Sequence, residues 1–219
     1  MADGQETELK WKIEEKDKII VALQRVVPPL FFDFDEEGDG PNADHETNIW
    51  FAYHDLNGIA VGEGVRLRII EHRNCGRAYE YLYLLTKKGP NTDPVFKVTT
   101  EEEIYVRFGS PQEAVQTFLF CGFVETFRYE KIRYNFRGPH IAIAYDTLPF
   151  IGDWIELEGD KAVIERVAKL LGLSMKKAVN QSYKKLFQQW QTDHPAFGVS
   201  VMTFVEDERC RTKDAPPKE

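Results

Sequence analysis

The chain has 219 residues and a mass of 25.4 kDa, which fits one domain with a sizeable core and excludes a large multidomain machine. Hydrophobic residues make up 42% and aromatic residues 13% of the chain, so a mainly disordered protein is excluded although 29% of the residues are charged. The 28 basic and 36 acidic residues give a net charge of −8, which argues against sequence-independent binding to nucleic acid or to an acidic membrane. Any anionic ligand must therefore be held by a local basic patch.

The predicted elements indicate an α+β fold, because segments with a two-residue alternation outnumber helical ones. In chain order we expect a strand at 6–13, a helix at 17–27, strands at 47–53, 65–73, 79–86 and 95–106, a helix at 111–120, strands at 126–136, 141–147 and 154–159, and helices at 161–171 and 175–191. Ser110 is expected to be the N-cap of the second helix. Residues 33–44 are expected to form an acidic loop. Residues 1–206 should form one domain, followed by a disordered tail from Asp207.

The cysteines and the hydropathy pattern predict a cytoplasmic protein. Cys75, Cys121 and Cys210 lie far apart in the sequence, which excludes a disulfide framework and the ligand spacing of a zinc site. The N-terminal segment lacks an apolar signal region, and no stretch approaches the ~20 apolar residues of a membrane-spanning helix. We therefore expect a monomer or homodimer that binds neither membranes nor nucleic acid.

In several predicted strands the charged residues alternate with apolar ones, so that the charges share one face. These residues are Glu6, Glu8 and Lys10; Arg66 and Arg68; Lys131 and Arg133; Asp146 with Ala142 and Ala144; and Glu156 and Glu158. A sheet with one solvated face would explain any single strand of this kind. A solvated face normally mixes signs to form cross-strand pairs, however, whereas these strands segregate carboxylates from bases. If the charged faces turn inward, the strands enclose a tunnel with an acidic and a basic part.

Each part of such a tunnel favours a different ligand. Clustered carboxylates favour a hard divalent cation, and the absence of Cys and His ligand spacing favours Mg²⁺ or Mn²⁺ over Zn²⁺. Arginine forks and lysine ammonium groups bind phosphate oxygens. A polyphosphate chain with a bound metal ion would neutralise both parts together. The run from Glu101 to Glu103 could add a tunnel carboxylate, but it is interpreted as a solvated segment.

The motifs and their order resemble the CYTH, or triphosphate tunnel metalloenzyme, family, which includes class IV adenylyl cyclases, thiamine triphosphatases and inorganic triphosphatases. The family's Glu-x-Glu-x-Lys hallmark is matched by ETELK, which carries Glu6, Glu8 and Lys10. RLR, LTKKGP, EKIR and YDTLPFIGDWIELEG follow in the family's order, and LGL with NQSYKKLF resembles its terminal helix. The resemblance covers nearly the whole chain. It implies an eight-stranded antiparallel β-barrel that forms a tunnel surrounded by helices.

The resemblance also implies a role for each matched residue. The implied metal ligands are Glu6, Glu8, Asp146, Glu156 and Glu158. The implied triphosphate-binding residues are Lys10, Arg66, Arg68, Lys88, Lys131 and Arg133. The implied catalytic residues are Glu6, Glu8, Lys10, Glu156 and Glu158.

Three functions are compatible with these residues. The first is a divalent-metal-dependent enzyme that hydrolyses an inorganic, nucleoside or organic triphosphate, such as tripolyphosphate, ATP or thiamine triphosphate. The second is a class IV adenylyl cyclase, which would convert ATP to cyclic AMP and pyrophosphate and would bind the phosphates with the same residues. The third is a non-catalytic polyphosphate or nucleotide sensor. The complete carboxylate set disfavours the sensor, because a protein that only binds needs fewer metal ligands.

Overall fold

The computed structural model describes residues 5–26, 43–54, 60–72, 80–138 and 140–213. The strands are β1 (Gln5–Lys12), β2 (Ala43–His54), β3 (Ala60–His72), β4 (Glu80–Lys88), β5 (Lys97–Val106), β6 (Phe123–Gly138), β7 (Ile141–Leu148) and β8 (Gly152–Gly159). The helices are α1 (Lys16–Val26), α2 (Pro111–Phe120), α3 (Lys161–Leu170), α4 (Tyr183–Asp193) and α5 (Phe204–Lys213), with single 3₁₀ turns η2 (Met175–Lys177) and η3 (Pro195–Phe197). Most of the acidic loop predicted at 33–44 lies outside the described residues, and its last two residues already belong to β2.

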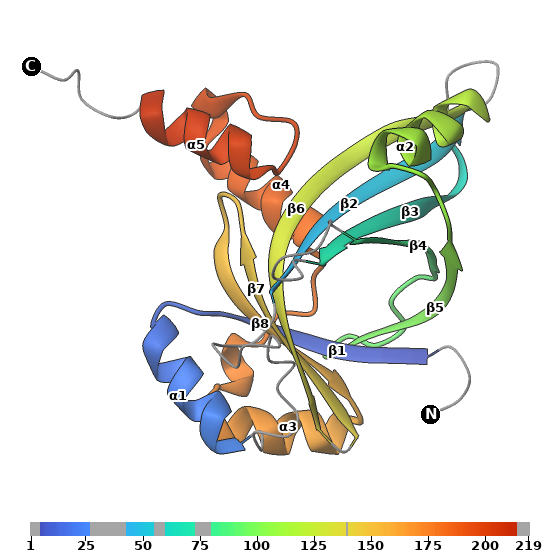
Figure 1. The fold of residues 1–219 in the computed structure, drawn as a ribbon. Helices are drawn as coiled ribbons and strands as arrows, with labels where there is room; N and C mark the ends of the chain where they lie inside the picture. Colours follow the sequence, from blue (N-terminus) through green and yellow to red (C-terminus); the bar gives the residue numbers. More distant parts are fainter. Residues whose placement is uncertain (1–4, 27–42, 55–59, 73–79, 139, 214–219) are drawn as a thin grey trace, which may run out of the picture.

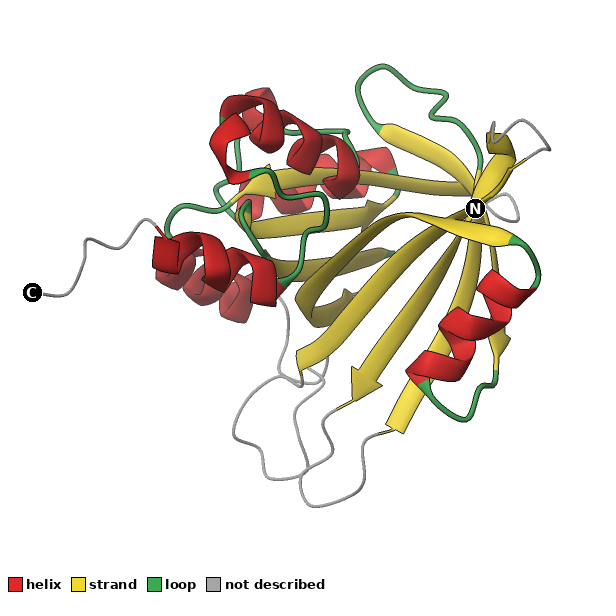
Figure 2. Ribbon diagram, turned by 90° about the horizontal axis from the view of Figure 1, so that it is seen from above, coloured by secondary structure: helices red, strands yellow, loops and turns green. Residues whose placement is uncertain are grey.

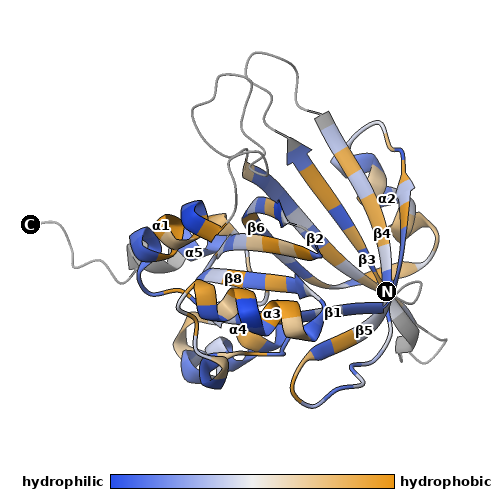
Figure 3. Ribbon diagram, turned by 90° about the horizontal axis from the view of Figure 1, so that it is seen from below, coloured by the Kyte–Doolittle hydropathy of each residue, from blue (hydrophilic) through white to orange (hydrophobic). Residues whose placement is uncertain are grey.

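The strands form a closed antiparallel barrel in the order β1-β5-β4-β3-β2-β6-β7-β8 (Figure 1). Viewed from above, the helices lie at several places around the strands (Figure 2). The α+β barrel predicted from the sequence is therefore confirmed. Hydrophilic and hydrophobic residues alternate along strands such as β3 (Figure 3), as expected where one face lines a polar interior and the other packs under helices. None of the helices in the described ranges is long and apolar enough to cross a bilayer.

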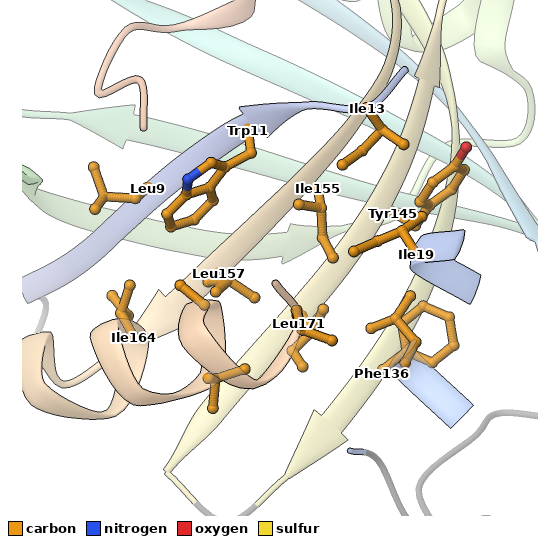
Figure 4. Packing of buried hydrophobic residues seen from close by; sticks show 14 of the residues in the cluster. Leu9, Trp11, Ile13, Ile19, Phe136, Tyr145, Ile155, Leu157, Ile164 and Leu171 are labelled. Carbon is orange, nitrogen blue, oxygen red and sulfur yellow. The ribbon is translucent and has the colours of Figure 1, made fainter. Parts of the chain in front are cut away.

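The largest hydrophobic cluster lies on the outer face of the barrel, beneath α1 and α3. Leu9 and Trp11 of β1 pack with Ile155 and Leu157 of β8, and Ile164 of α3 covers them (Figure 4). All five side chains are at most 2% exposed. Since Leu9 and Trp11 alternate with Glu8 and Lys10, burying the apolar residues outside turns the charged ones toward the interior.

A second outer cluster lies beneath α2, where Phe118 of the helix stacks on Phe51 of β2 with 4.6 Å between the ring centroids. As predicted, Ser110 caps this helix by accepting a hydrogen bond from the Glu113 amide at 3.1 Å. Burial of Leu67 of β3 in the same cluster directs its neighbours Arg66 and Arg68 inward.

A third cluster brings α4 against inward-facing residues of the barrel. Tyr183 and Phe187 of α4 pack with Tyr129 of β6 and Trp154 of β8. Tyr129 shares its strand face with Lys131 and Arg133. The helix therefore supplies an apolar floor directly beside the charged interior.

The helix predicted at 175–191 is wrong in its first half. Only Met175–Lys177 form a 3₁₀ turn, and α4 begins at Tyr183, with Ser182 as its N-cap. Between them, Val179 exchanges backbone hydrogen bonds with Lys10, at 2.9 and 2.8 Å. This part of β1 lies beyond the residues that pair with β5, so its free backbone groups hold the segment in an extended conformation.

The disordered tail predicted from Asp207 is corrected in its described part, because α5 continues as a helix to Lys213; residues 214–219 lie outside the described residues. Met202 is fully buried before this helix and exchanges backbone hydrogen bonds with β6. The Phe204 amide then donates to the Glu130 carboxylate at 2.9 Å, and Asp207 is only 9% exposed. These contacts anchor the start of a helix whose composition alone gives no packing signal.

Candidate active site

The inward-facing residues line one cavity of about 1400 Å³ in the barrel. Every residue predicted as catalytic or phosphate-binding lines it: Glu6, Glu8, Lys10, Arg66, Arg68, Lys88, Lys131, Arg133, Glu156 and Glu158. Asp146, which the resemblance places among the metal ligands, is fully buried behind this wall. Residues 150 positions apart in the sequence thus meet in one compartment.

Carboxylates crowd the part of the cavity formed by β1 and β8. Glu8 lies opposite Glu158 in the β1–β8 ladder, and Lys10 lies opposite Glu156. Burial raises the pKa of Glu158 to about 8, together with repulsion from Glu6, Glu156 and Glu8, against a smaller opposing effect of Lys88. Glu158 is therefore the carboxylate that most needs an added positive charge in order to ionise.

Lysines occupy the spaces between the other carboxylates. Lys10 Nζ lies 2.5 Å from Glu8 and 2.8 Å from Glu156, and Lys97 forms a second ion pair with Glu8. Lys88 Nζ lies 2.7 Å from Glu6. Burial and Glu156 raise the pKa of Glu8, but Lys10 and Lys97 outweigh them and leave it below its ordinary value. Glu8 is thus held as an anion in the interior.

The basic part centres on Arg133 of β6. Its Nε and Nη2 donate to the two oxygens of Asp146 at 2.7 and 2.6 Å, and Nη2 also donates to Glu156 at 3.1 Å. The Tyr183 hydroxyl donates to Asp146 at 2.7 Å. The bidentate geometry fixes the plane of the guanidinium group, and with it the direction of the charge that it offers to an anion.

Glu46 of β2 is a functional candidate that sequence reasoning missed. It is 2% exposed and lies 3.2 Å from Lys131 and 3.7 Å from Arg68. Burial would raise the pKa of Glu46, but Lys131, Arg68 and Arg133 hold it well below its usual range. The signal was present in the alternation of Asp44, Glu46 and Asn48 on one strand face.

Glu101 forms ion pairs with both Arg66 and Lys88. The structure therefore corrects the interpretation of this residue as part of a solvated segment. Glu101 Oε1 lies 2.9 Å from Arg66, and Oε2 lies 2.5 Å from Lys88. Glu103 also lines the cavity, whereas Glu102, which lies between them in the sequence, does not. The sequence did not determine which of these glutamates face inward, because three consecutive glutamates offer a carboxylate to either face of the strand. The pairing of Glu101 on β5 with Lys88 on β4 fixes the register.

Two arginine groups that line this cavity have a buried donor without a hydrogen bond. Among the described residues, the buried Nε atoms of Arg66 and Arg68 have no hydrogen-bond partner. A buried donor without a partner costs free energy that a ligand acceptor would recover. Both arginines therefore have the capacity to bind a further anion besides their protein carboxylates.

The acidic residues fit a hard divalent cation by donor chemistry. Glu6, Glu8 and Glu158 offer carboxylate oxygens, which Mg²⁺ and Mn²⁺ prefer, and the raised pKa of Glu158 reflects its burial together with repulsion from the neighbouring carboxylates. Across the described ranges, no three His, Cys, Asp or Glu side chains are arranged to hold a metal ion. The lysine ammonium groups separate the carboxylates, so a cation would have to displace them.

Comparison with known proteins extends over most of the chain. No family model matches it. A Methanocaldococcus jannaschii protein named "Putative adenylate cyclase MJ0240" is 28% identical over 191 residues, which span 83% of this chain and 97% of that protein.

Solved structures share the barrel. PH1819 protein from Pyrococcus horikoshii OT3 has a TM-score of 0.61 and 22% identity, covering 84% of this chain and 98% of that chain. A Vibrio parahaemolyticus protein, described as "a putative adenylate cyclase", has a TM-score of 0.58 and 19% identity, covering 84% and 97%. At these identities the likeness shows the fold alone, so the reaction must be argued from the site.

Proposed function

We propose that this protein is a metal-dependent enzyme that acts on a triphosphate compound and belongs to the CYTH, or triphosphate tunnel metalloenzyme, type. The observation that carries the proposal is the composition of the cavity. Arg66 and Arg68 lie on β3, and Lys131 and Arg133 lie on β6, which is separated from β3 by β2; crowded carboxylates lie on β1 and β8. A chain of phosphates with a bound divalent cation carries both charges that such a compartment needs.

The basic side chains would bind and orient the phosphate groups. The guanidinium groups of Arg66 and Arg68, whose buried Nε atoms lack a hydrogen bond, would donate to phosphate oxygens, and Arg133, fixed by Asp146, would present a guanidinium group of defined direction. Charge that develops on phosphoryl oxygens in the transition state would be stabilised by the same donors. These groups would thus contribute both to binding and to turnover.

The acidic side chains would hold the divalent cation. Glu6, Glu8, Glu156 and Glu158 are the proposed ligands for Mg²⁺ or Mn²⁺. A bound divalent cation would offset phosphate charge and act as a Lewis acid. Lys10 lies between Glu8 and Glu156, so it would move toward a phosphate oxygen when those carboxylates take up the cation.

Hydrolysis of the triphosphate is the reaction that we propose first. Cyclisation of ATP is the second candidate, and it is favoured by the name of the Methanocaldococcus jannaschii relative. The two reactions would use the same phosphate cradle and differ in the nucleophile, which is water in one and the ribose 3′-hydroxyl in the other.

Product analysis distinguishes these reactions. The purified protein is incubated with ATP or tripolyphosphate and Mg²⁺ or Mn²⁺, and the products are identified. Orthophosphate from tripolyphosphate supports hydrolysis, whereas cyclic AMP and pyrophosphate from ATP support cyclisation. Binding of both compounds without any turnover would contradict an enzyme and favour a sensor.

A matched pair of variants tests the role of the cavity. Glu8→Gln should abolish turnover, because Glu8 is both a proposed cation ligand and the partner of Lys10 and Lys97. Glu102→Gln makes the same change on the outer face of β5 and should retain activity. Full activity of Glu8→Gln, or of the wild type in excess chelator, would overturn the metalloenzyme proposal.

A further inference from the structure

One end of the charged cavity has an apolar wall. Ile70 of β3, Leu82 and Leu84 of β4 and Tyr105 of β5 all line the cavity, and we call these four residues the apolar band. They are neighbours on one continuous surface, since Ile70 lies opposite Leu82 and Leu84 lies opposite Tyr105. The band is therefore continuous across three strands.

The apolar band leaves hydrophobic surface in contact with water. Leu84 is 4% exposed, but Leu82 is 36% exposed and Tyr105 is 75% exposed. Covering such surface is favourable by roughly 25 cal/mol per Å² of apolar area. Inorganic triphosphate, which is polar over its whole surface, would gain nothing from contact with these side chains.

The band begins beside the phosphate-binding arginines. Arg68 lies opposite Leu84 in the β3–β4 ladder and two residues before Ile70 on the same strand face. Two residues along a strand span roughly 6.6 Å. A group attached to a phosphate at Arg68 would therefore reach the band without leaving the cavity.

The barrel provides space opposite the band. In the closed strand order, β7 lies four strands from β4, and its inward-facing residues at this end are Ala142 and Ala144. The cavity of about 1400 Å³ also exceeds the roughly 300–1,000 Å³ typical of small-molecule sites. Small side chains on one wall and branched or aromatic ones on the other suit a flat ring.

Polar groups flank the same end of the cavity. The Asn135 side-chain amide of β6 donates to Asp44 of β2 at 3.0 Å, and both residues line the cavity. A few hydrogen-bonding groups beside an apolar surface are the usual arrangement for orienting a ring with polar edges.

We propose that the apolar band binds the heteroaromatic base of a nucleoside triphosphate whose phosphates are bound by Arg66, Arg68, Lys131 and Arg133. The substrate is then an organic triphosphate, and Leu82 and Tyr105 determine its specificity. This inference rests on the proposed function, because it takes the phosphate position from the cradle.

Calorimetric titration with ATP and with tripolyphosphate tests the proposal, in excess EDTA so that no metal-dependent turnover occurs. The test variant is Leu82→Ala combined with Tyr105→Ala. The control is Tyr81→Ala combined with Ile104→Ala, which truncates the adjacent residues on the outer face. Tyr81 is 36% and Ile104 59% exposed, so both pairs remove partly exposed side chains from the same two strands.

The test variant should weaken ATP binding roughly tenfold, about the effect of losing one buried aliphatic side chain, and leave tripolyphosphate binding unchanged. The control should leave both unchanged. Equal weakening for both ligands, or no change for ATP, would overturn the band as a base site. If wild-type protein binds neither compound, the cradle itself is wrong and the proposed function fails with it.

Discussion

The Tyr183 hydroxyl donates a hydrogen bond of 2.7 Å to Asp146, and so connects α4 to β7 inside the barrel. Asp146 is fully buried, and its two oxygens also accept from Arg133. The Tyr183 ring lies beneath Lys10 and Lys131, at 5.2 and 5.9 Å from its centroid. One tyrosine from the C-terminal part of the chain thus contacts groups on β1, β6 and β7.

Tyr183→Phe should therefore lower turnover more than it disturbs the fold. The ring remains, but Asp146 loses one hydrogen bond, of a kind worth roughly 1.5–3 kcal/mol to a charged group, so Arg133 is less firmly held. We expect kcat for tripolyphosphate to fall at least severalfold and the melting temperature to fall by a few degrees. Tyr134→Phe, on the outer face of the same barrel, is the control. Unchanged kcat in Tyr183→Phe would show that the hydrogen bond does not position Arg133.

The raised pKa of Glu158 predicts that the metal-free protein loses stability as the pH rises. The folded protein keeps the proton up to a pKa of about 8, whereas an unfolded glutamate releases it near 4.5, so folding is favoured most below pH 4.5 and loses this contribution between the two values. Glu158→Gln, which cannot ionise, should be more stable than the wild type above pH 8 and similar at low pH. Urea unfolding at several pH values in EDTA measures this. A stability difference independent of pH would contradict the assignment.

Arg66→Ala should weaken both the binding and the turnover of a triphosphate. Arg66 is 5% exposed, has a free Nε donor and is held by Glu101, which keeps Lys88 as a partner when the arginine is removed. Loss of one or two charged hydrogen bonds corresponds to roughly a tenfold to hundredfold fall in kcat/KM for tripolyphosphate. Arg128→Ala, on the outer face of β6, should leave kcat/KM unchanged. A similar effect of both substitutions would indicate a general change of charge.

Tripolyphosphate with Mg²⁺ should stabilise the folded protein. A ligand that binds only the folded state adds about 2.7 kcal/mol at a hundredfold excess over Kd. This corresponds to a rise in melting temperature of several degrees, at about 2–4 °C per kcal/mol for a chain of this size. Orthophosphate spans only part of the cradle and should give a much smaller shift in a thermal-unfolding experiment. Equal shifts for the two anions would indicate a generic anion patch.

Alternation within single strands was sufficient to predict much of the cavity. Because successive side chains in a strand point to opposite faces, burial of Leu9 and Leu157 outside requires Glu8 and Glu158 to face inward. The same reasoning applies to Arg66 and Arg68 around the buried Leu67. These are local properties, which the order of residues determines by itself.

Closure of the barrel decided which charges became partners. The register of β4 against β5 selected Glu101 over Glu102, and the approach of β2 to β6 placed Glu46 beside Lys131. The free edge of β1 at Lys10 held Val179 in an extended segment and so placed Tyr183 against Asp146. Side-chain alternation fixes which face of a strand is buried, but pairing between distant strands depends on how the whole chain closes. For this reason the sequence alone determined the chemistry of the cavity, and only the tertiary structure decided its ion pairs, its floor and its apolar wall.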